Sequence, residues 1–258
     1  ISMTDKPSNL SDSASLSSTD DIYANSAGEQ LTGQFTFDSA VARVFPDMIK
    51  RSVPGYAETV AMSGVIAGEY ARDNTNLYDL GCSLGAVTLA MRHGVKATGC
   101  KILGVDNSAA MIEQAGHYLA LDEGGVDVEL SCADITQLSI ENASVVALNY
   151  VLQFIPKDQR LELLSNIAAG INAGGALILS EKICFSDDEQ ALQDKLHLDF
   201  KRANGYSELE IAQKRSAIEN VLVPETEADH MARLKEAGFS RVIRWYQCFN
   251  FVSYLAIK

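Results

Sequence analysis

The chain contains the stretch Tyr78-Asp79-Leu80-Gly81-Cys82-Ser83-Leu84-Gly85, which follows a short apolar run and opens a helical one. Glycines at such a turn let the backbone come close to a ligand, and the start of the helix offers unpaired N–H groups. A dinucleotide site would have the spacing Gly-x-Gly-x-x-Gly, whereas Ser83 occupies the middle position, which counts against a pyrophosphate ligand. The acid Asp79, before the first glycine, suits a cationic, amino-acid-like ligand better. Taken alone, the stretch also fits a plain strand-to-helix turn.

Around this stretch, apolar runs alternate with segments of helical spacing. The runs are almost continuously apolar, as in strands of a sheet that is covered on both faces. Strands that alternate with helices indicate β-α-β units and a parallel sheet. We expect strands at residues 76–80, 101–106, 126–133, 143–149 and 176–180, helices at residues 85–93, 109–121 and 160–171, and a turn at residues 172–175.

Two helices are expected before this alternation, at residues 39–51 and 58–70. Pro46 lies within the first helix and is expected to kink or restart it, because proline lacks an N–H group. The second helix is amphipathic. Its inner side is expected to carry Val60, Val65 and Ile66.

The pattern breaks after the fifth strand. Two inserted helices, residues 188–200 and 207–221, are expected over the active-site end of the sheet, and a last helix follows at residues 229–237. Two successive strands at residues 242–246 and 251–258 imply an antiparallel pair. A mostly parallel, seven-stranded sheet that ends in an antiparallel hairpin is typical of the Rossmann-like α/β fold of class I methyltransferases that use S-adenosyl-L-methionine (SAM).

Length and composition favour one domain behind a tail. Residues 1–34 are rich in Ser and Asp and are expected to be a disordered tail, whereas residues 35–258 form the SAM-binding domain, with a helical insertion at about residues 185–225. No apolar run approaches the roughly 20 residues of a membrane helix, so no membrane partner is expected. The odd number of cysteines, without a C-x-x-C pair, and the scattered histidines favour a reducing cytoplasm and no metal site.

The charge balance bears on possible partners. A net charge of −13 at pH 7 repels phosphate backbones, so no direct nucleic-acid contact is expected. The nearest candidates for a basic patch are the pairs Lys201-Arg202 and Lys214-Arg215. A solvated helix face is the more common explanation for such pairs.

Polar residues stand at the ends of consecutive expected strands. Asp106 ends the second strand, Asp134 follows the third and Asn149 ends the fourth. An acid after the second strand can accept hydrogen bonds from two ribose hydroxyls, and an acid after the third can accept an amino hydrogen of adenine. Capping of the next helix is the alternative role for Asp106, although Asn107 or Ser108 can supply that cap. Because open α/β sheets bind ligands at this edge, these residues and the glycine turn together predict a SAM site.

Six stretches carry a closer resemblance. They are Val44-Phe45-Pro46-Asp47-Met48-Ile49, Arg51-Ser52-Val53-Pro54-Gly55-Tyr56, Asp79-Leu80-Gly81-Cys82-Ser83, Phe200-Lys201-Arg202-Ala203-Asn204-Gly205-Tyr206-Ser207-Glu208-Leu209-Glu210, Gln213-Lys214-Arg215 and Gln247-Cys248-Phe249-Asn250-Phe251. They resemble the carboxy-S-adenosyl-L-methionine (carboxy-SAM) synthase family of bacterial tRNA wobble-uridine modification. The strings in the inserted helices and the last strands are the most specific, because ordinary methyltransferases lack them.

The resemblance implies an enzyme that carboxylates the SAM methyl group instead of transferring it, with prephenate as carboxyl source and phenylpyruvate as by-product. Carboxy-SAM then passes to a separate tRNA-modifying transferase, and a homodimer is expected because the family is dimeric. The chemistry is reasonable, since the sulfonium makes the methyl hydrogens weakly acidic. A base formed as prephenate loses hydroxyl and CO2 can leave an ylide, which captures CO2 in a closed, dry pocket.

The resemblance also implies site residues. Arg215 would hold the new carboxylate in its guanidinium fork and Tyr56 would donate a second hydrogen bond, so both are expected to act in catalysis. The positions that match ligands of SAM, or of carboxy-SAM as bound product, are Tyr56, Gly81, Cys82, Ser83, Asp106, Asn107, Asp134, Ile135, Asn149 and Arg215. The alternatives are a surface arginine paired with Glu219 and a turn tyrosine packed on the core.

Two other functions stay open. An ordinary SAM-dependent methyltransferase for a small molecule has no use for a cation beside the transferred methyl group, so Arg215 discriminates against it. A non-enzymatic nucleoside-binding module would bind SAM without consuming prephenate. The sequence leaves undecided which base removes the methyl proton, what the tail does, and whether the inserted helices cover their own site or that of a partner subunit.

Overall fold

The computed structural model describes residues 19–20, 37–218 and 221–258. Apart from residues 19 and 20, the predicted tail at residues 1–34 lies outside the described residues. In the described part of the chain, no helix is both long and apolar enough to cross a bilayer.

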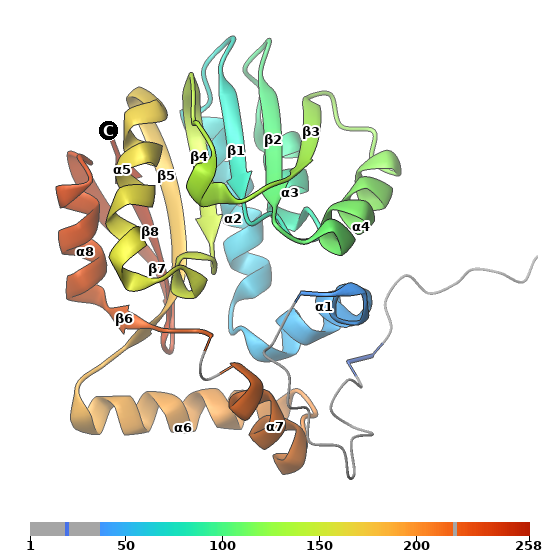
Figure 1. Cartoon of the computed structure of the whole chain (residues 1–258), viewed down its shortest axis with the longest axis vertical. Coiled ribbons are helices and arrows are strands. Elements are labelled where there is room, and N and C mark those ends of the chain that lie inside the picture. The colour runs from blue at the N-terminus through green and yellow to red at the C-terminus, as the bar shows by residue number, and fades with distance from the viewer. Residues whose placement is uncertain (1–18, 21–36, 219–220) are drawn as a thin grey trace, which may run out of the picture.

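One twisted sheet forms the centre of the molecule (Figure 1). Its order is β3-β2-β1-β4-β5-β8-β7, and the short β6 pairs with β5 off this path. β1 to β5 are parallel, whereas β8 runs antiparallel to both of its neighbours, as the sequence predicted. The strands are β1 (Asn76–Leu80), β2 (Lys101–Asp106), β3 (Asp127–Cys132), β4 (Ala143–Asn149), β5 (Ile171–Cys184), β6 (Glu225–Thr226), β7 (Arg241–Cys248) and β8 (Phe251–Ile257).

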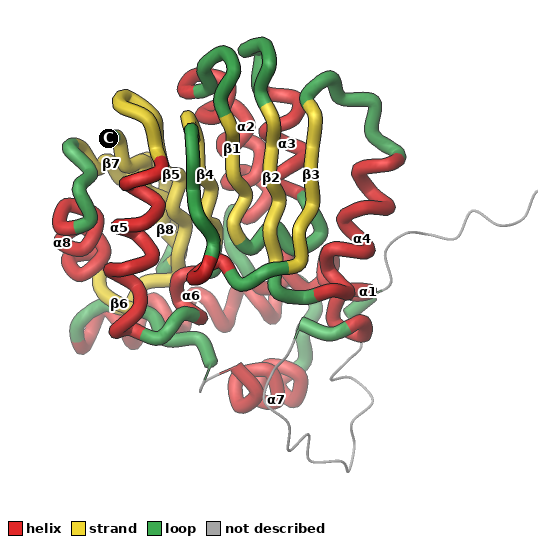
Figure 2. Tube along the Cα trace, turned by 45° about the horizontal axis from the view of Figure 1, so that its top comes forward, coloured by secondary structure: helices red, strands yellow, loops and turns green. Residues whose placement is uncertain are grey.

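Helices cover both faces of the sheet (Figures 1 and 2). β4 shows why its sequence is almost wholly apolar: Val145 packs toward α2 and α3, and Val146 packs toward α5 and α8 on the other face. The helices are α1 (Ser39–Ser52), α2 (Tyr56–Tyr70), α3 (Ala86–Gly94), α4 (Ala109–Ala120), α5 (Arg160–Gly170), α6 (Asp187–Ala203), α7 (Glu208–Ile218) and α8 (Glu227–Glu236), with short 3-10 turns η1 (Ile135–Gln137), η2 (Leu152–Phe154) and η3 (Lys157–Gln159).

Three helices lie beyond the carboxyl ends of the parallel strands, where α1, α6 and α7 form the lower part of Figure 1. The apolar face of α1 packs on Leu84 of the glycine turn and on Met111 of α4. Arg51 at the end of α1 donates from Nε to the carbonyl of Asn204 (2.7 Å) and lies over the ring of Tyr206. The inserted helices are thereby joined to the end of the sheet at which ligands are expected.

The predicted inner side of α2 is wrong at one position, because Val65 is 60% exposed. The side of α2 that faces α3 carries small residues instead. A Cβ on Gly64 would lie 2.4 Å from the carbonyl oxygen of Ala90, and one on Gly68 would lie 2.5 Å from that of Gly94. The two helices approach so closely that large side chains have no room between them, so apolar spacing alone misplaced the buried face. Val60 and Ile66 pack against the core as predicted.

Two further predictions differ from the structure in part. The expected turn at residues 172–175 belongs to the long strand β5, whose pairing with β4 shifts register after Ala143. α1 runs through Pro46 from Ser39 to Ser52, so the helix does not restart at the proline, and its bounds agree with the predicted residues 39–51 to within one residue.

Candidate functional site

The glycine turn after β1 adopts a left-handed backbone at three of its residues. Gly81, Ser83 and Gly85 all have positive φ angles of 78°, 50° and 82°. A Cβ at Gly81 would lie 2.3 Å from Cγ2 of Val151, so the position has no room for a side chain. The N–H group of Gly81 donates to the carbonyl of Val105 (2.7 Å), which ties the turn to β2. The main chain of the turn is therefore not covered by a side chain at Gly81.

Cys82 contributes little beyond this backbone. Its side chain is buried, its N–H group donates to the carbonyl of Val105 (3.0 Å), and its carbonyl accepts from Gly85. Asp79, three residues earlier, is 2% exposed and accepts a 2.6 Å hydrogen bond from Thr88. Burial raises the pKa of Asp79 to about 6 against the lowering by that bond. Near neutral pH a negative charge therefore lies beneath the turn.

Asp106 reaches across the end of β2 to the glycine turn. One carboxylate oxygen accepts from the N–H of Ser83 (2.9 Å) and the other from the N–H of Ser108 (2.9 Å). Ser108 is the residue that caps α4, since its hydroxyl accepts from the N–H of Met111. Ser108 therefore caps α4, and the alternative role of Asp106 as the cap of this helix is not needed. The carboxylate of Asp106 has further accepting capacity for a ligand, and the neighbouring Asn107 is exposed.

Asp134 and Ile135 follow β3. Oδ1 of Asp134 accepts from the N–H and the hydroxyl of Thr136 (2.9 and 2.8 Å), which caps η1 and fixes the carboxylate at the sheet edge. The Ile135 side chain is buried in the core. Contact between Ile135 and a ligand would therefore use its main chain.

Asn149 ends β4 with an unsatisfied acceptor. Its Oδ1 is buried and has no hydrogen-bond partner among the described residues, while Nδ2 lies 3.5 Å from the hydroxyl of Ser63. Buried polar atoms without a partner are rare, and a bound donor is a common reason for one. An amino group of SAM fits this requirement, so the residues present suit the ligand that the sequence predicted.

Tyr56 stands at one end of a row of rings. Its centroid lies 6.3 Å from that of Tyr150, which lies 6.0 Å from Phe251, and Phe251 lies 5.0 Å from His197. Burial first, and then the charge of Asp79, raise the pKa of the Tyr56 hydroxyl above its usual range. The hydroxyl stays protonated near neutral pH and is available as a donor on the side of the glycine turn.

Arg215 is exposed on α7, and its alternative partner Glu219 lies outside the described residues. Its charge nevertheless helps to lower the pKa values of Lys182 and Lys201. The sequence analysis favoured a solvated helix face for the pairs Lys201-Arg202 and Lys214-Arg215. This interpretation is wrong for the two lysines. Lys201 and Lys214 are partly buried because α6 and α7 pack toward α1, where Lys214 lies over the ring of Tyr206.

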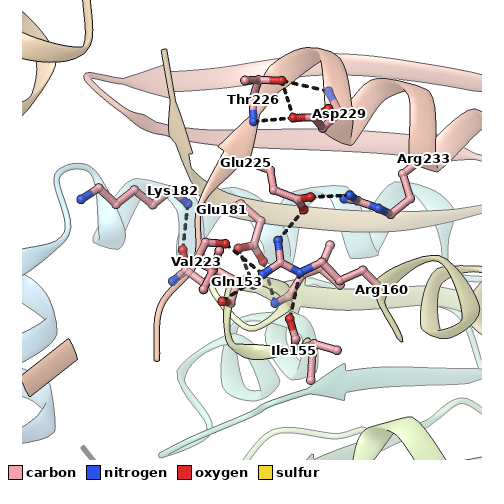
Figure 3. A network of polar contacts seen from close by, with 11 residues as sticks. Gln153, Ile155, Arg160, Glu181, Lys182, Val223, Glu225, Thr226, Asp229 and Arg233 are labelled. Carbon is pink, nitrogen blue, oxygen red and sulfur yellow. Dashed lines mark hydrogen bonds and ion pairs between the residues drawn. The ribbon is translucent and has the colours of Figure 1, made fainter. Parts of the chain in front are cut away.

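The sequence reasoning missed a network at the end of β5 (Figure 3). Glu181 is fully buried, and its carboxylate accepts from the N–H groups of Leu152 (2.8 Å) and Gln153 (3.0 Å). Burial raises its pKa to about 8 although these bonds lower it. Arg160 pairs with Glu225 and donates to the carbonyl of Gln153. The network fixes the loop that follows Asn149. The sequence analysis looked for polar residues at the ends of strands 1 to 4. The same search at the end of strand 5 would have found Glu181.

No metal cluster is present in the described part: no three His, Cys, Asp or Glu residues there could hold an ion together. All five cysteines are free thiols. The candidate site is therefore an edge of the sheet that carries acids and exposed turn backbone, bordered by aromatic rings and by basic residues from β5, α6 and α7. Its ligand contacts stay predictions.

Known proteins match this chain in sequence and in fold. A methyltransferase-domain family model matches residues 77–175. The solved structure of magnesium protoporphyrin IX methyltransferase from Synechocystis PCC 6803, with bound S-adenosylhomocysteine, has a TM-score of 0.56 at 19% identity and covers 90% of each chain. This likeness shows the fold alone, and it confirms the predicted class I methyltransferase fold.

The curated relatives are far closer. The carboxy-S-adenosyl-L-methionine synthase of Marinobacter nauticus is 58% identical over 241 residues, which cover 93% of this chain and 95% of the relative. The synthase of the same name from Trichlorobacter lovleyi is 58% identical over 242 residues, covering 93% and 98%. The matched length includes the inserted helices as well as the sheet. This chain therefore belongs to the carboxy-S-adenosyl-L-methionine synthase family.

Proposed function

We propose that the protein is a SAM-dependent transferase that converts SAM and prephenate into carboxy-SAM and phenylpyruvate. The observation that carries this proposal is the 58% identity to carboxy-SAM synthases over almost the whole chain. The physical support is a site whose nucleoside side is acidic and whose opposite side is basic. Such a division suits a cationic sulfonium substrate next to an anionic carboxyl donor.

Each part of SAM has a matching group in the proposal. Gly81, Cys82 and Ser83 form the turn that approaches the amino-acid moiety, and the carboxylate of Asp106 accepts from the ribose hydroxyls, with Asn107 beside it. Asp134 and the main chain of Ile135 bind adenine. Oδ1 of Asn149 is the orphaned acceptor that SAM satisfies. SAM supplies an acidic methyl group on sulfur, and the remaining chemistry depends on how the chain holds the second substrate.

The proposed reaction balances without a metal or a further reactant. Prephenate loses its ring carboxylate as CO2 and its ring hydroxyl as hydroxide, and becomes aromatic phenylpyruvate. The hydroxide takes one proton from the SAM methyl group and becomes water, and the methyl carbon then bonds to CO2. CO2 must not escape between these events, which requires a covered pocket. The ring row from Tyr56 to His197 and the helices α1, α6 and α7 are the parts of the chain that cover this edge.

Arg215 and Tyr56 are the proposed catalytic residues. A guanidinium presents a planar fork of donors that matches a carboxylate, so Arg215 holds the carboxylate before and after its transfer. Tyr56 donates a second hydrogen bond, since its raised pKa keeps its proton in place. An ordinary methyltransferase would need neither group at that position.

The wider setting is part of the same proposal. Carboxy-SAM is passed to a separate tRNA-modifying transferase, and the acidic chain with its net charge of −13 does not itself bind tRNA. A cytoplasmic homodimer with a tail at residues 1–34 and one SAM-binding domain at residues 35–258 is the proposed organisation. Five free thiols are in keeping with a reducing compartment.

The test is mass spectrometry of the nucleoside product after incubation with SAM and prephenate. We expect a species with the mass of SAM plus one CO2, together with phenylpyruvate in equal amount. Methylation of a supplied small molecule without that species would favour the ordinary methyltransferase. SAM binding with no consumption of prephenate would favour a non-enzymatic binding module.

A further inference from the structure

Two lysines of the site come from different elements and lie near one another. Lys182 is on β5, two residues after Ser180, the last position that pairs with β4, and Lys201 is in the last turn of α6. Both are partly buried. Each helps to lower the pKa of His197, and Lys182 helps to lower that of Lys201, so the three groups lie within electrostatic range of each other.

The fold explains this approach. The backbone of Lys182 pairs with Phe251 on β8, and the ring of Phe251 packs edge-on against His197 at 5.0 Å. Nε2 of His197 lies 2.8 Å from the carbonyl of Ser52, so α6 is held against the end of α1. Lys201 follows His197 by four residues and shares its helix face. The lysines therefore adjoin the same row of rings that begins at Tyr56.

His197 itself adds no charge. Burial and the two lysines lower its pKa to about 3, so the ring is neutral near pH 7. A carbonyl oxygen can only accept, which means that Nε2 carries the ring proton. His197 acts as a spacer that positions Lys201, and the positive charge belongs to the lysines.

Neither lysine has an ion-pair partner in the described part of the chain, although the more distant charge of Asp194 on α6 partly opposes the lowering of the pKa of Lys182 by burial. No carboxylate there lies within ion-pair distance of the Nζ atom of Lys182 or Lys201, whereas Lys195 on the same helix pairs with Asp199 at 3.2 Å. Figure 3 shows the Lys182 side chain extending away from the carboxylates of Glu181 and Glu225. Burial and neighbouring positive charge lower the pKa of Lys201 to about 8. Partly buried like charges repel, and a bound anion removes that cost.

We propose that Lys182 and Lys201 form a carboxylate-binding site for the group of the carboxyl donor that is not transferred. The inference rests on the proposed function, because prephenate carries two carboxylates and only one becomes CO2. Arg215 holds the transferred carboxylate, and the other one, on the pyruvyl side chain, stays in phenylpyruvate and requires its own cations. The two lysines supply them, fix the direction in which the donor enters, and bind the by-product as well as the substrate.

The test replaces each lysine by methionine, which keeps the apolar stem and removes the charge. For Lys182→Met and Lys201→Met we expect the KM for prephenate and the Kd for phenylpyruvate to rise roughly tenfold to hundredfold, the usual effect of losing a charge-assisted bond. The Kd for SAM should stay within about twofold. Lys182→Arg and Lys201→Arg, which restore the charge, should recover much of the lost affinity if the fold is intact.

Lys195→Met is the matched control. It removes the same charge from α6, but its side chain is 72% exposed, so all constants should stay unchanged. An unchanged KM for prephenate in both methionine variants would overturn the inference, and so would an equal loss of SAM and phenylpyruvate binding, which indicates a structural role. If the unmodified protein makes no carboxy-SAM, the proposed function fails separately. Calorimetry of phenylpyruvate on the complex with S-adenosylhomocysteine then still decides whether the lysines bind a carboxylate.

Discussion

The edge of the parallel sheet and the region next to the inserted helices carry opposite charges. Acids stand at the sheet edge, and basic residues stand next to the inserted helices. At the sheet edge, a half-buried acid and a fully buried acid are held by backbone N–H groups: Asp106 accepts from Ser83 and Ser108, and Glu181 from Leu152 and Gln153. On the inserted side, Lys182 and Lys201 are cations that the described chain leaves without an ion pair. The two acids are thus held from within the protein, whereas Lys182 on β5 and Lys201 on α6 form the proposed site for an anion from outside it.

This difference separates the side of the site that is proposed to bind SAM from the side that is proposed to bind the carboxyl donor. The fold is shared with a methyltransferase of 19% identity whose match covers 90% of this chain. The basic side is built from the end of β5 together with α6 and α7, which follow it in the chain. A change on one side should therefore affect SAM, and a change on the other side the carboxyl donor.

The largest expected effect is on the basic side. Arg215→Ala should lower the rate of carboxy-SAM formation roughly hundredfold or more, because a fixed charge on the transferred carboxylate is lost, and leave the Kd for SAM within about threefold. Steady-state kinetics and calorimetry measure the two quantities. Arg202→Ala is the control, since this exposed arginine pairs with Asp199 and Glu208 outside the site. Equal losses of SAM binding and carboxylation would show that Arg215 is structural.

The next effect lies at the glycine turn. Gly81→Ala forces a Cβ to within 2.3 Å of Val151 at a φ of 78°. We expect the free energy of unfolding to fall by about 1–3 kcal/mol, because the turn must move to make room for the Cβ. We also expect SAM to bind about tenfold more weakly or worse. Thermal unfolding and calorimetry test this expectation. Gly125→Ala, which meets no atom within 4 Å, should change neither, and a normal SAM affinity in Gly81→Ala would remove the turn from the site.

A smaller effect is expected at the end of β2. Asp106→Ala should weaken SAM binding roughly tenfold by removing the carboxylate from the ribose hydroxyls, with KM for prephenate little changed at saturating SAM. Glu129→Ala on the neighbouring strand removes an acid whose side chain is 55% exposed and should leave SAM affinity as it was. The ribose role is refuted if both variants bind SAM equally well.

The smallest effect concerns stability and pH. The pKa of Glu181 is raised to about 8 in the folded protein, mainly by burial. The folded state therefore binds a proton more tightly than the unfolded state, and stability from this group is present below about pH 4 and lost as pH rises through 8. Unfolding midpoints between pH 5 and pH 9 should fall more steeply for the unmodified protein than for Glu181→Gln. Glu123→Gln, at an exposed position, should follow the unmodified protein; parallel curves for all three would contradict the raised pKa.

Local pattern predicted the sheet well. β2 and β4 have the predicted bounds, residues 101–106 and 143–149, because buried parallel strands are almost continuous apolar runs. The same pattern placed Asp106 and Asn149 at the carboxyl ends of β2 and β4. The pattern predicted the buried face of α2 incorrectly at Val65. Gly64 and Gly68 make a close contact with α3 there, and the spacing of apolar residues does not indicate such a contact.

The basic side could not be predicted in the same way. Lys182 and Lys201 are brought together by the pairing of β5 with β8 and by the contact of Phe251 with His197. These contacts join residues far apart in the chain, so a reading of local charge assigned Lys201 to a solvated face. Only the fold shows that the partly buried charge of Lys201 adjoins that of Lys182.

The number of hydrogens that the SAM methyl group keeps distinguishes the proposed carboxylation of SAM from the methyl transfer of an ordinary methyltransferase. SAM whose methyl group carries deuterium at all three positions is incubated with the protein and prephenate, and the nucleoside product is analysed by mass spectrometry. Loss of a single deuterium to solvent and gain of one CO2 on the same carbon is the result that we predict. A methyl group that leaves with all three deuterium atoms, and S-adenosylhomocysteine as the remaining nucleoside, would contradict it.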